Sequence, residues 1–132
     1  MSSVSTKTAT TSKPRKRRVD SRAKGARGER ELAKFLQSHG YEARRGQQNC
    51  GGPESPDVKH DIPGIHIECK RTETLSLYPA LAQAIRDAGS ALTPTVWHKR
   101  NGNEWLVILR AEDFLSYVRL DHAYPLSDWI AP

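Results

Sequence analysis

The sequence has few of the residues and patterns that mark secreted or membrane-spanning proteins. Its 132 residues include two cysteines, Cys50 and Cys69, which form no CxxC pair. No apolar run approaches the roughly 20 residues that cross a bilayer, and the N-terminal region lacks the apolar segment of a secretory signal. No set of Cys and His residues has the spacing of a structural zinc site. We therefore expect a cytoplasmic protein in a reducing compartment, with no membrane partner.

Positive charge is concentrated at the N-terminus rather than spread along the chain. Residues 1–24 carry eight Lys and Arg residues and one acid, Asp20, whereas the rest of the chain carries 13 bases and 14 acids. The same region begins with many Ser and Thr residues and has few apolar ones, a composition typical of disorder. We predict a disordered basic arm over residues 1–22 that suits phosphate backbones. A tail that only aids solubility and a nuclear address are the alternatives.

The remainder of the chain has the pattern of one small mixed α/β domain over residues 23–121, followed by a tail over 122–132. Hydrophobic residues make up 36% of the sequence, enough for a single modest core. Helical spacing of Leu32, Phe35 and Leu36 predicts a first helix over 24–40, and Pro79 fits the first turn of a second helix over 78–89. Short alternating segments predict strands over 41–47, 57–60, 65–71, 93–100 and 104–110, with a closing helix over 111–120. These elements predict helices packed on a central sheet.

The expected strands at 57–60 and 65–71 carry the charged residues Asp57, Glu68 and Lys70 among others. If residues 61–64 form a hairpin loop, side-chain alternation places Asp57 opposite Glu68, with Lys70 further along the same face. The other face would be the core, formed by Val58, Ile65, Ile67 and Cys69. Opposed carboxylates destabilise a strand pair unless a cation lies between them, and carboxylate oxygens are ligands that Mg²⁺ prefers. In such a site, Lys70 is placed to orient a nucleophilic water or to offset charge on an attacked phosphate.

A solvent-exposed strand face, on which Lys59 and Lys70 neutralise the acids, is the alternative to a metal site. The first helix favours the metal site, because at roughly 100° per residue Glu29 falls on the inward, apolar side of that helix. A carboxylate there is costly unless it is paired or bound to a metal. A boundary residue that reaches sideways to an arginine is the other interpretation of Glu29. Gly25 and Gly28 also point inward or nearly so, which allows close backbone approach.

With these residues assembled, the sequence resembles the PD-(D/E)XK nuclease superfamily, and within it the archaeal-type Holliday-junction resolvases and their phage relatives. The superfamily signature is matched by SPDV followed by IECK. A helix that contains Lys-Gly and a glutamate is matched by KGARGERELAKFL, and the turn after it by SHGYEARR. A helix that contains Gln-Ala is matched by LAQAIRDAG, and the last two strands and short helix by TPTVWHKRNGNEWLVILRAEDFLSYV. The resemblance covers about residues 23–118.

This resemblance implies a restriction-endonuclease-like fold, an αβββαβ core in which helices flank a mixed central sheet. It also implies a metal-dependent DNA endonuclease in which Asp57, Glu68 and the backbone carbonyl of Cys69 hold Mg²⁺ or Mn²⁺. Glu29 would support that metal or a second one, and Lys70 would lie beside the attacking water. The product would be a nicked phosphodiester with a 5′-phosphate. Such proteins commonly act as homodimers on branched DNA, so a four-way junction and a second copy of the chain are the expected partners.

Five residues outside the metal site are expected to contact DNA: Lys24, Arg27, Arg44, Arg45 and Gln83. Arg44 and Arg45 suit phosphate contacts, with a solvated pair as the alternative. Gln83 matches a position of the resolvase family, yet it projects away from the apolar face of its helix, so an ordinary exposed glutamine is the alternative. The segment GQQNCGGPES lacks the Ser-Gly loop of the resolvases. Flap, single-strand or restriction-like cleavage therefore stays open, as does a non-catalytic nucleic-acid-binding module.

Overall fold

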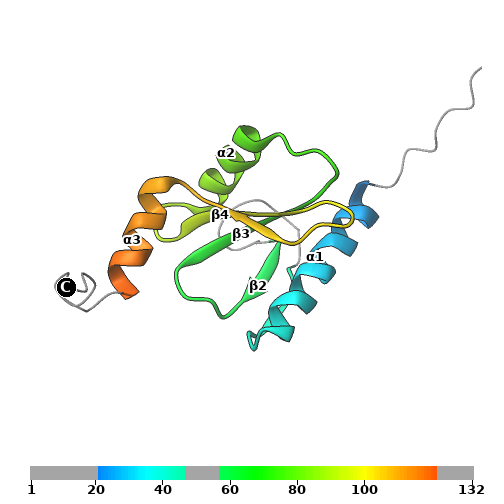
Figure 1. Ribbon diagram of the computed structural model, residues 1–132, viewed down its shortest axis with the longest axis horizontal. Helices are drawn as coiled ribbons and strands as arrows, with labels where there is room; N and C mark the ends of the chain where they lie inside the picture. Colours follow the sequence, from blue (N-terminus) through cyan, green and yellow to red (C-terminus); the bar gives the residue numbers. More distant parts are fainter. Residues whose placement is uncertain (1–20, 47–56, 122–132) are drawn as a thin grey trace, which may run out of the picture.

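A computed structural model describes residues 21–46 and 57–121, and it has the predicted order of helices and strands (Figure 1). The helices are α1 (Ser21–Ser38), α2 (Leu77–Ala88) and α3 (Ala111–Asp121). The strands are β1 (Ala43–Arg45), β2 (Val58–His60), β3 (Ile65–Arg71), β4 (Thr93–Lys99) and β5 (Leu106–Ile108). Most of the predicted basic arm, the loop before Asp57 and the predicted tail lie outside the described residues. Within the described ranges, no helix combines the length and the apolar character that a membrane span requires.

The strands form two sheets. In one, β3 and β4 run parallel with Glu68 beside Val96, and β5 pairs antiparallel with β4. In the other, β1 and β2 are antiparallel, with Arg45 opposite Val58. A parallel pair requires a crossover connection, and α2 supplies it between β3 and β4. The fold is therefore the mixed α/β, restriction-endonuclease-like core that the sequence predicted.

The predicted hairpin between β2 and β3 is wrong, because β2 pairs with β1 and β3 pairs with β4. The polar groups near the expected hairpin form hydrogen bonds with other parts of the chain. The backbone N–H of Asp61 donates to the carbonyl of Glu42 (3.2 Å), and the Asp61 carboxylate accepts the Glu42 N–H (3.0 Å), which ties the turn to the β1 side. The Asp57 carboxylate accepts the backbone N–H of Cys69 at 2.8 Å. Asp57 is thus held against β3 by its side chain, not through a ladder position opposite Glu68.

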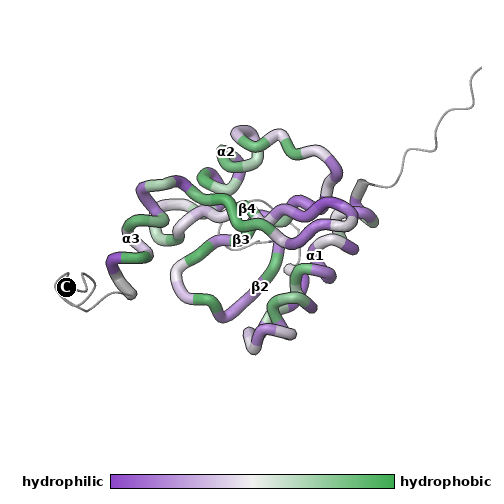
Figure 2. Tube along the Cα trace, viewed as in Figure 1, coloured by the Kyte–Doolittle hydropathy of each residue, from purple (hydrophilic) through white to green (hydrophobic). Residues whose placement is uncertain are grey.

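The helix α1 packs on one face of the larger sheet and forms the main core. Leu32 and Leu36 are buried against Ile67 of β3 and Trp97 of β4, together with Val58. Burying an aliphatic side chain of this size stabilises a fold by about 1.5–3 kcal/mol. The apolar residues predicted for the core face of β2 and β3 are therefore placed as expected. Figure 2 shows hydrophobic segments on α1 and β2 and a hydrophilic turn that connects β4 to β5.

The helix α2 covers the opposite face of the sheet. Ala80 and Ala84 of α2 pack against Val96 of β4. On the same face, His66 and Glu68 are 2% and 3% exposed. The alternative interpretation, a solvent-exposed strand face, is therefore wrong for these two residues. Parallel strands are usually covered on both faces. The alternation of polar and apolar residues in the sequence had instead suggested a strand pair with one solvent-exposed face.

The buried side of α2 also differs from the predicted one. Helical spacing in the sequence predicts an apolar face formed by Leu81, Ala84, Ile85 and Ala88. In the structure the buried residues are Ala80, Ala84 and Ala88, while Ile85 is 36% exposed. At about 100° per residue this difference is a rotation of roughly 50°, which the small alanine side chains allow because they let the helix lie close to the strands. The rotation brings Gln83 from the far side of the helix to the edge of the sheet.

Candidate active site

A cavity of about 380 Å³ lies where α1, β3 and α2 converge. The four residues predicted to be catalytic, Glu29, Asp57, Glu68 and Lys70, all line it. The remaining lining residues are Lys24, Gly25, Cys69, Arg71, Thr72 and Gln83. The fold thus brings together acids and a lysine that lie on separate elements, although the hairpin from which they were first grouped is not formed.

Asp57 is positioned by a hydrogen bond to the strand that carries the other two residues of the motif. Its Oδ2 accepts the backbone N–H of Cys69 at 2.8 Å, which fixes the carboxylate relative to β3. Burial raises the pKa of the Cys69 thiol well above its ordinary value of 9.0, and the nearby carboxylates of Asp57 and Glu29 raise it further. The thiol is therefore neutral at physiological pH and unsuited to nucleophilic chemistry.

Glu68 is a buried carboxylate held between two nitrogen-bearing side chains. Lys70 Nζ lies 3.3 Å from its Oε1, and His66 Nε2 lies 3.7 Å from its Oε2. Burial raises the pKa of Glu68, but His66 and Lys70 outweigh that effect and hold the pKa below its ordinary value of 4.5. Glu68 is thus ionised at neutral pH, as a metal ligand has to be.

Lys70 is held from two sides at the mouth of the cavity. Its Nζ donates to Oε1 of Gln83 at 3.1 Å and lies close to Glu68. The side chain keeps 29% of its surface exposed, so the ammonium group can reach a molecule in the cavity. Gln83 is partly buried and lines the cavity, rather than being an ordinary exposed glutamine.

Glu29 faces inward from α1, as the helical pattern predicted, and it also contacts an arginine. It is 4% exposed, and its Oε2 accepts a hydrogen bond from Nε of Arg45 at 2.8 Å. The two interpretations of Glu29 from the sequence are therefore compatible. Arg45 neutralises part of the negative charge where the three acids meet.

Close packing of α1 on β3 depends on one of the two glycines predicted to face inward. A Cβ atom added at Gly28 would lie 2.4 Å from Cβ of Arg71. A Cβ atom added at Gly25 would meet nothing within 4 Å, so the prediction of close approach is wrong for that residue. Gly28 therefore sets the distance between the helix that carries Glu29 and the strand that carries Glu68.

An ion-pair network beside the cavity was not anticipated from the sequence. Glu31 accepts hydrogen bonds from Arg71 Nε and Lys99 Nζ, both at 2.9 Å, and so links α1 to the ends of β3 and β4. At about 100° per residue, Glu31 falls on the solvent side of α1. The signal that could have found the network is the basic residue at the end of each strand, since Arg71 and Lys99 are aligned in the parallel register.

The residues expected to contact DNA are spread over a wider surface than the cavity. Lys24 and Gln83 line the cavity, and Arg45 borders it through Glu29. Arg27 and Arg44 are exposed and do not line it. Arg44 lies instead beside a separate hollow with residues of β2.

The donor set of the cavity fits a divalent cation bound through oxygen. Three carboxylates, those of Glu29, Asp57 and Glu68, line the same space. Mg²⁺ and Mn²⁺ prefer carboxylate, carbonyl and water oxygens. The lowered pKa of Glu68 keeps its carboxylate ionised before a cation binds. The hydrogen bond from the Cys69 N–H orients the carboxylate of Asp57.

Comparison with known protein families gives one match over most of the chain. The model of the family described as archaeal Holliday junction resolvase (hjc) matches residues 20–111. The matched range runs from α1 through β5 and contains every residue that lines the cavity. No curated protein and no solved structure matches the chain.

Proposed function

The chain belongs to the archaeal Holliday junction resolvase family, and from that premise we propose that it is a Mg²⁺- or Mn²⁺-dependent endonuclease that cuts four-way DNA junctions. The observation that carries the proposal is the convergence of Glu29, Asp57, Glu68 and Lys70 on one cavity. Three carboxylates and a lysine supply both a cation site and a positive group beside it. That combination suits the hydrolysis of a phosphodiester.

In this proposal Asp57, Glu68 and the backbone carbonyl of Cys69 hold the cation, and Glu29 supports it or a second one. A bound cation supplies a water of lowered pKa and offsets charge on the scissile phosphate. Lys70 orients the attacking water or donates to a phosphate oxygen. Gln83 accepts a hydrogen bond from Lys70 Nζ and so fixes the direction of the ammonium group. The product is a nicked strand with a 5′-phosphate.

DNA would be held mainly through its phosphates. Lys24 lies at the cavity, and Arg27 and Arg44 are exposed on α1 and β1. Arg45 adds a partly exposed guanidinium beside Glu29. Phosphate contacts of this kind give salt-dependent affinity without sequence readout. The basic arm over residues 1–22 would extend the same interaction, which agrees with an enzyme that recognises the shape of its substrate.

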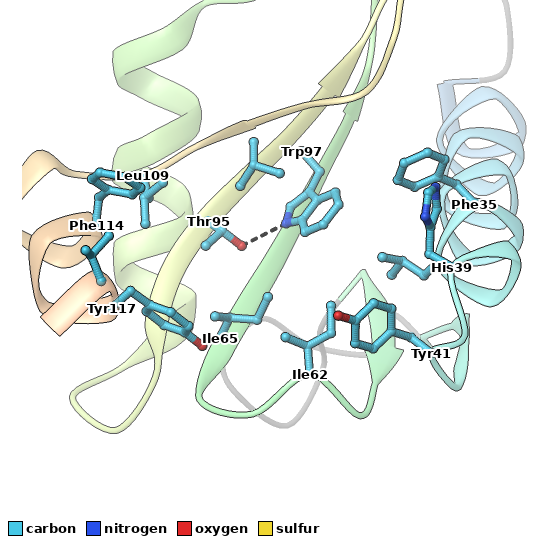
Figure 3. A pocket seen from close by; sticks show the side chains of 13 residues that line it. Phe35, His39, Tyr41, Ile62, Ile65, Thr95, Trp97, Leu109, Phe114 and Tyr117 are labelled. Carbon is cyan, nitrogen blue, oxygen red and sulfur yellow. Dashed lines mark hydrogen bonds between the residues drawn. The ribbon is translucent and has the colours of Figure 1, made fainter. Parts of the chain in front are cut away.

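A second copy of the chain is the protein partner that we propose. An apolar groove of about 510 Å³ runs between α1 and α3, with side chains from both helices and from the strands turned toward it (Figure 3). Phe114 and Val107 line it and are 53% and 44% exposed, and exposed apolar side chains that gather at a groove mark an interaction surface. Val107 also belongs to β5, which has a ladder partner, β4, on one side only within the described residues. An apolar sheet edge is usually covered.

Two-fold symmetry of the substrate supports that choice of partner. A four-way junction is resolved by two cuts, and each chain has one cavity with the proposed catalytic set. A dimer formed through the groove would supply two such cavities. Sedimentation of the full chain is expected to give a dimer, and Phe114→Glu a monomer. A monomeric full chain that dimerises when residues 122–132 are removed would assign the groove to the chain's own C-terminal segment instead.

A substrate panel tests the proposed activity. The full chain is incubated with a four-way junction, a flap, a linear duplex and a single strand that share one sequence, in Mg²⁺, in Mn²⁺ and in a chelator. We expect metal-dependent nicking of the junction at least about tenfold faster than of the duplex. Faster cleavage of the flap, the single strand or the duplex than of the junction would identify a nuclease of different substrate specificity. Binding of the junction without cleavage in either metal would identify a non-catalytic binding module.

A further inference from the structure

Three side chains that can ligate metals gather behind the cavity, between β3 and the end of α2. They are His66, Glu68 and Asp87, and one ligand atom from each lies within 4.8 Å of the other two. Zinc–ligand bonds are about 2.0–2.2 Å long and tetrahedrally arranged, so the ligand atoms of one ion lie about 3.4 Å from each other. Side-chain movements of about an ångström therefore close this set around an ion. Asp87 is only partly buried, which leaves a route from solvent.

His66 is the residue that singles out this cluster from an ordinary group of acids. Its side chain is 1% exposed, and neither ring nitrogen has a hydrogen-bond partner among the described residues. A buried ring whose nitrogens lack hydrogen-bond partners costs free energy that a folded protein normally avoids. Its Nε2 lies 3.7 Å from Oε2 of Glu68, too far for a hydrogen bond and suitable for two ligands of a common ion.

Asp87 gives a second reason to expect a cation at this place. It is the penultimate residue of α2. The carbonyl end of a helix carries partial negative charge, so an acid in the last turn is unfavourable unless positive charge is nearby. Arg86 is the one basic residue in that turn, and no described ion pair joins it to Asp87. The buried carboxylate of Glu68 adds more negative charge to the same region.

We propose that His66, Glu68 and Asp87 form a second metal site that binds Zn²⁺ or a similar transition ion, separate from the Mg²⁺ or Mn²⁺ site of the cavity. An imidazole with two carboxylates suits Zn²⁺ and Co²⁺, whereas Mg²⁺ prefers oxygen ligands and water. A water molecule would fill the fourth position. Glu68 joins the two sites, because its Oε1 faces Lys70 and its Oε2 faces His66. The ion would fasten α2 to β3 and hold Glu68 in place.

Binding of Co²⁺ to the untagged full chain tests this site without reference to cleavage. Co²⁺ is titrated as its chloride, and the visible absorption of the bound ion is recorded. Zn²⁺ is then added as the competitor, and Mg²⁺ in excess as the control. We expect one tightly bound Co²⁺ per chain, displaced by Zn²⁺ and not by Mg²⁺, and a rise in the melting temperature on addition of Zn²⁺.

Four variants locate the ion. Asp87→Asn and His66→Gln are expected to weaken Co²⁺ binding by at least about tenfold and to abolish the Zn²⁺-dependent rise in melting temperature. Asp87→Asn removes a partly exposed ligand and keeps the test open if the buried His66→Gln variant does not fold. Asp113→Asn, on α3, is the matched control and keeps full binding. Asp57→Asn alters the cavity alone and is also expected to keep it.

Two results would overturn the second site. One is the same Co²⁺ affinity in Asp87→Asn as in the parent chain. The other is loss of all Co²⁺ binding in Asp57→Asn, which would place the ion in the cavity. Because Asp57 belongs to the cavity and Asp87 does not, failure of this site and failure of the proposed nuclease centre are distinguishable: the first appears in the Co²⁺ titration of Asp87→Asn, the second in DNA cleavage by the parent chain.

Discussion

Gly28 of α1 lies so close to Arg71 of β3 that a methyl group at residue 28 would stand 2.4 Å from the Arg71 Cβ atom. This contact joins two parts of the proposed centre. Glu29 follows Gly28 directly, and Arg71 follows Lys70. Any change in the spacing of the helix and the strand at this point therefore moves a carboxylate relative to the lysine.

Replacing Gly28 by alanine should lower the stability of the fold. The added methyl group meets a Cβ atom near the backbone, so α1 has to shift, and such overpacking costs about 1–3 kcal/mol. Urea denaturation of the Gly28→Ala variant measures the loss. Gly25→Ala is the matched control on the same helix, since nothing lies within 4 Å of its added methyl group. Gly25→Ala should stabilise the protein by up to about 1 kcal/mol through helix propensity. Equal effects of the two changes would contradict the packing argument.

Removing the guanidinium of Arg45 should destabilise the protein through its effect on Glu29. Arg45→Met leaves a buried carboxylate with less positive charge nearby, and we expect a loss of about 1–2 kcal/mol, less than for a fully buried pair because Arg45 is partly exposed. The double variant Glu29→Gln with Arg45→Met should lose less than Arg45→Met alone. Arg44→Met, at the neighbouring exposed position, should change the unfolding free energy by under about 0.5 kcal/mol. Additive effects of the Glu29 and Arg45 changes would show that the pair does not couple.

Gln83 should act on cleavage through Lys70 rather than through the binding of DNA. Gln83→Ala removes the acceptor that holds Lys70 Nζ at 3.1 Å. We expect the cleavage rate at saturating protein to fall about tenfold, its pH profile to shift, and the affinity for the junction to stay nearly unchanged. Arg86→Ala, an exposed change on the same helix, is the control. A fall in affinity with an unchanged cleavage rate would instead make Gln83 a DNA contact.

The ion pairs of Glu31 should make stability depend on pH in the acid range. Burial raises the pKa of Glu31, but the hydrogen bonds from Lys99 and Arg71 outweigh it and hold the pKa below the ordinary value of 4.5. A carboxyl whose pKa is lower in the folded state stabilises the fold fully above its unfolded pKa. That contribution is lost as the pH falls through the folded value. The urea concentration at the midpoint of unfolding should therefore fall as the pH is lowered below about 5. It should fall less steeply in the Glu31→Gln variant. The same dependence of the urea midpoint on pH in both proteins would show that the ion pairs of Glu31 do not cause the loss of stability in acid.

The sequence predicted the elements well because their signals are local. Helical spacing of Leu32 and Leu36, the Pro79 start of α2 and the turn before β5 each depend on a few neighbouring residues. The ladder partners of β2 and β3 were predicted wrongly, because strand pairing depends on contacts that are distant in sequence. Two short strands with a turn between them suit a hairpin, yet β3 pairs with β4 across the α2 crossover.

Part of the candidate site was predicted from a wrong assumption about strand pairing. Asp57 and Glu68 were grouped by a hairpin register, whereas a hydrogen bond from the Cys69 N–H to Asp57 is what brings Asp57 to β3. Glu29 was correctly placed on the inner side of α1, because helical geometry fixes that direction. Gln83 could not be placed, since the rotation of α2 follows from how closely its alanines approach the sheet. His66 and Asp87 were not connected at all, because no sequence pattern links a strand residue to the end of the following helix.

The central claim is that Glu29, Asp57, Glu68 and Lys70 form one metal-dependent nuclease centre. Single-turnover cleavage of a four-way junction in Mg²⁺ by Lys70→Met, compared with the parent chain at equal junction occupancy, tests it most directly. The variant should still bind the junction, and its cleavage rate should fall by at least about a hundredfold. Cleavage by Lys70→Met at the rate of the parent chain would contradict the claim.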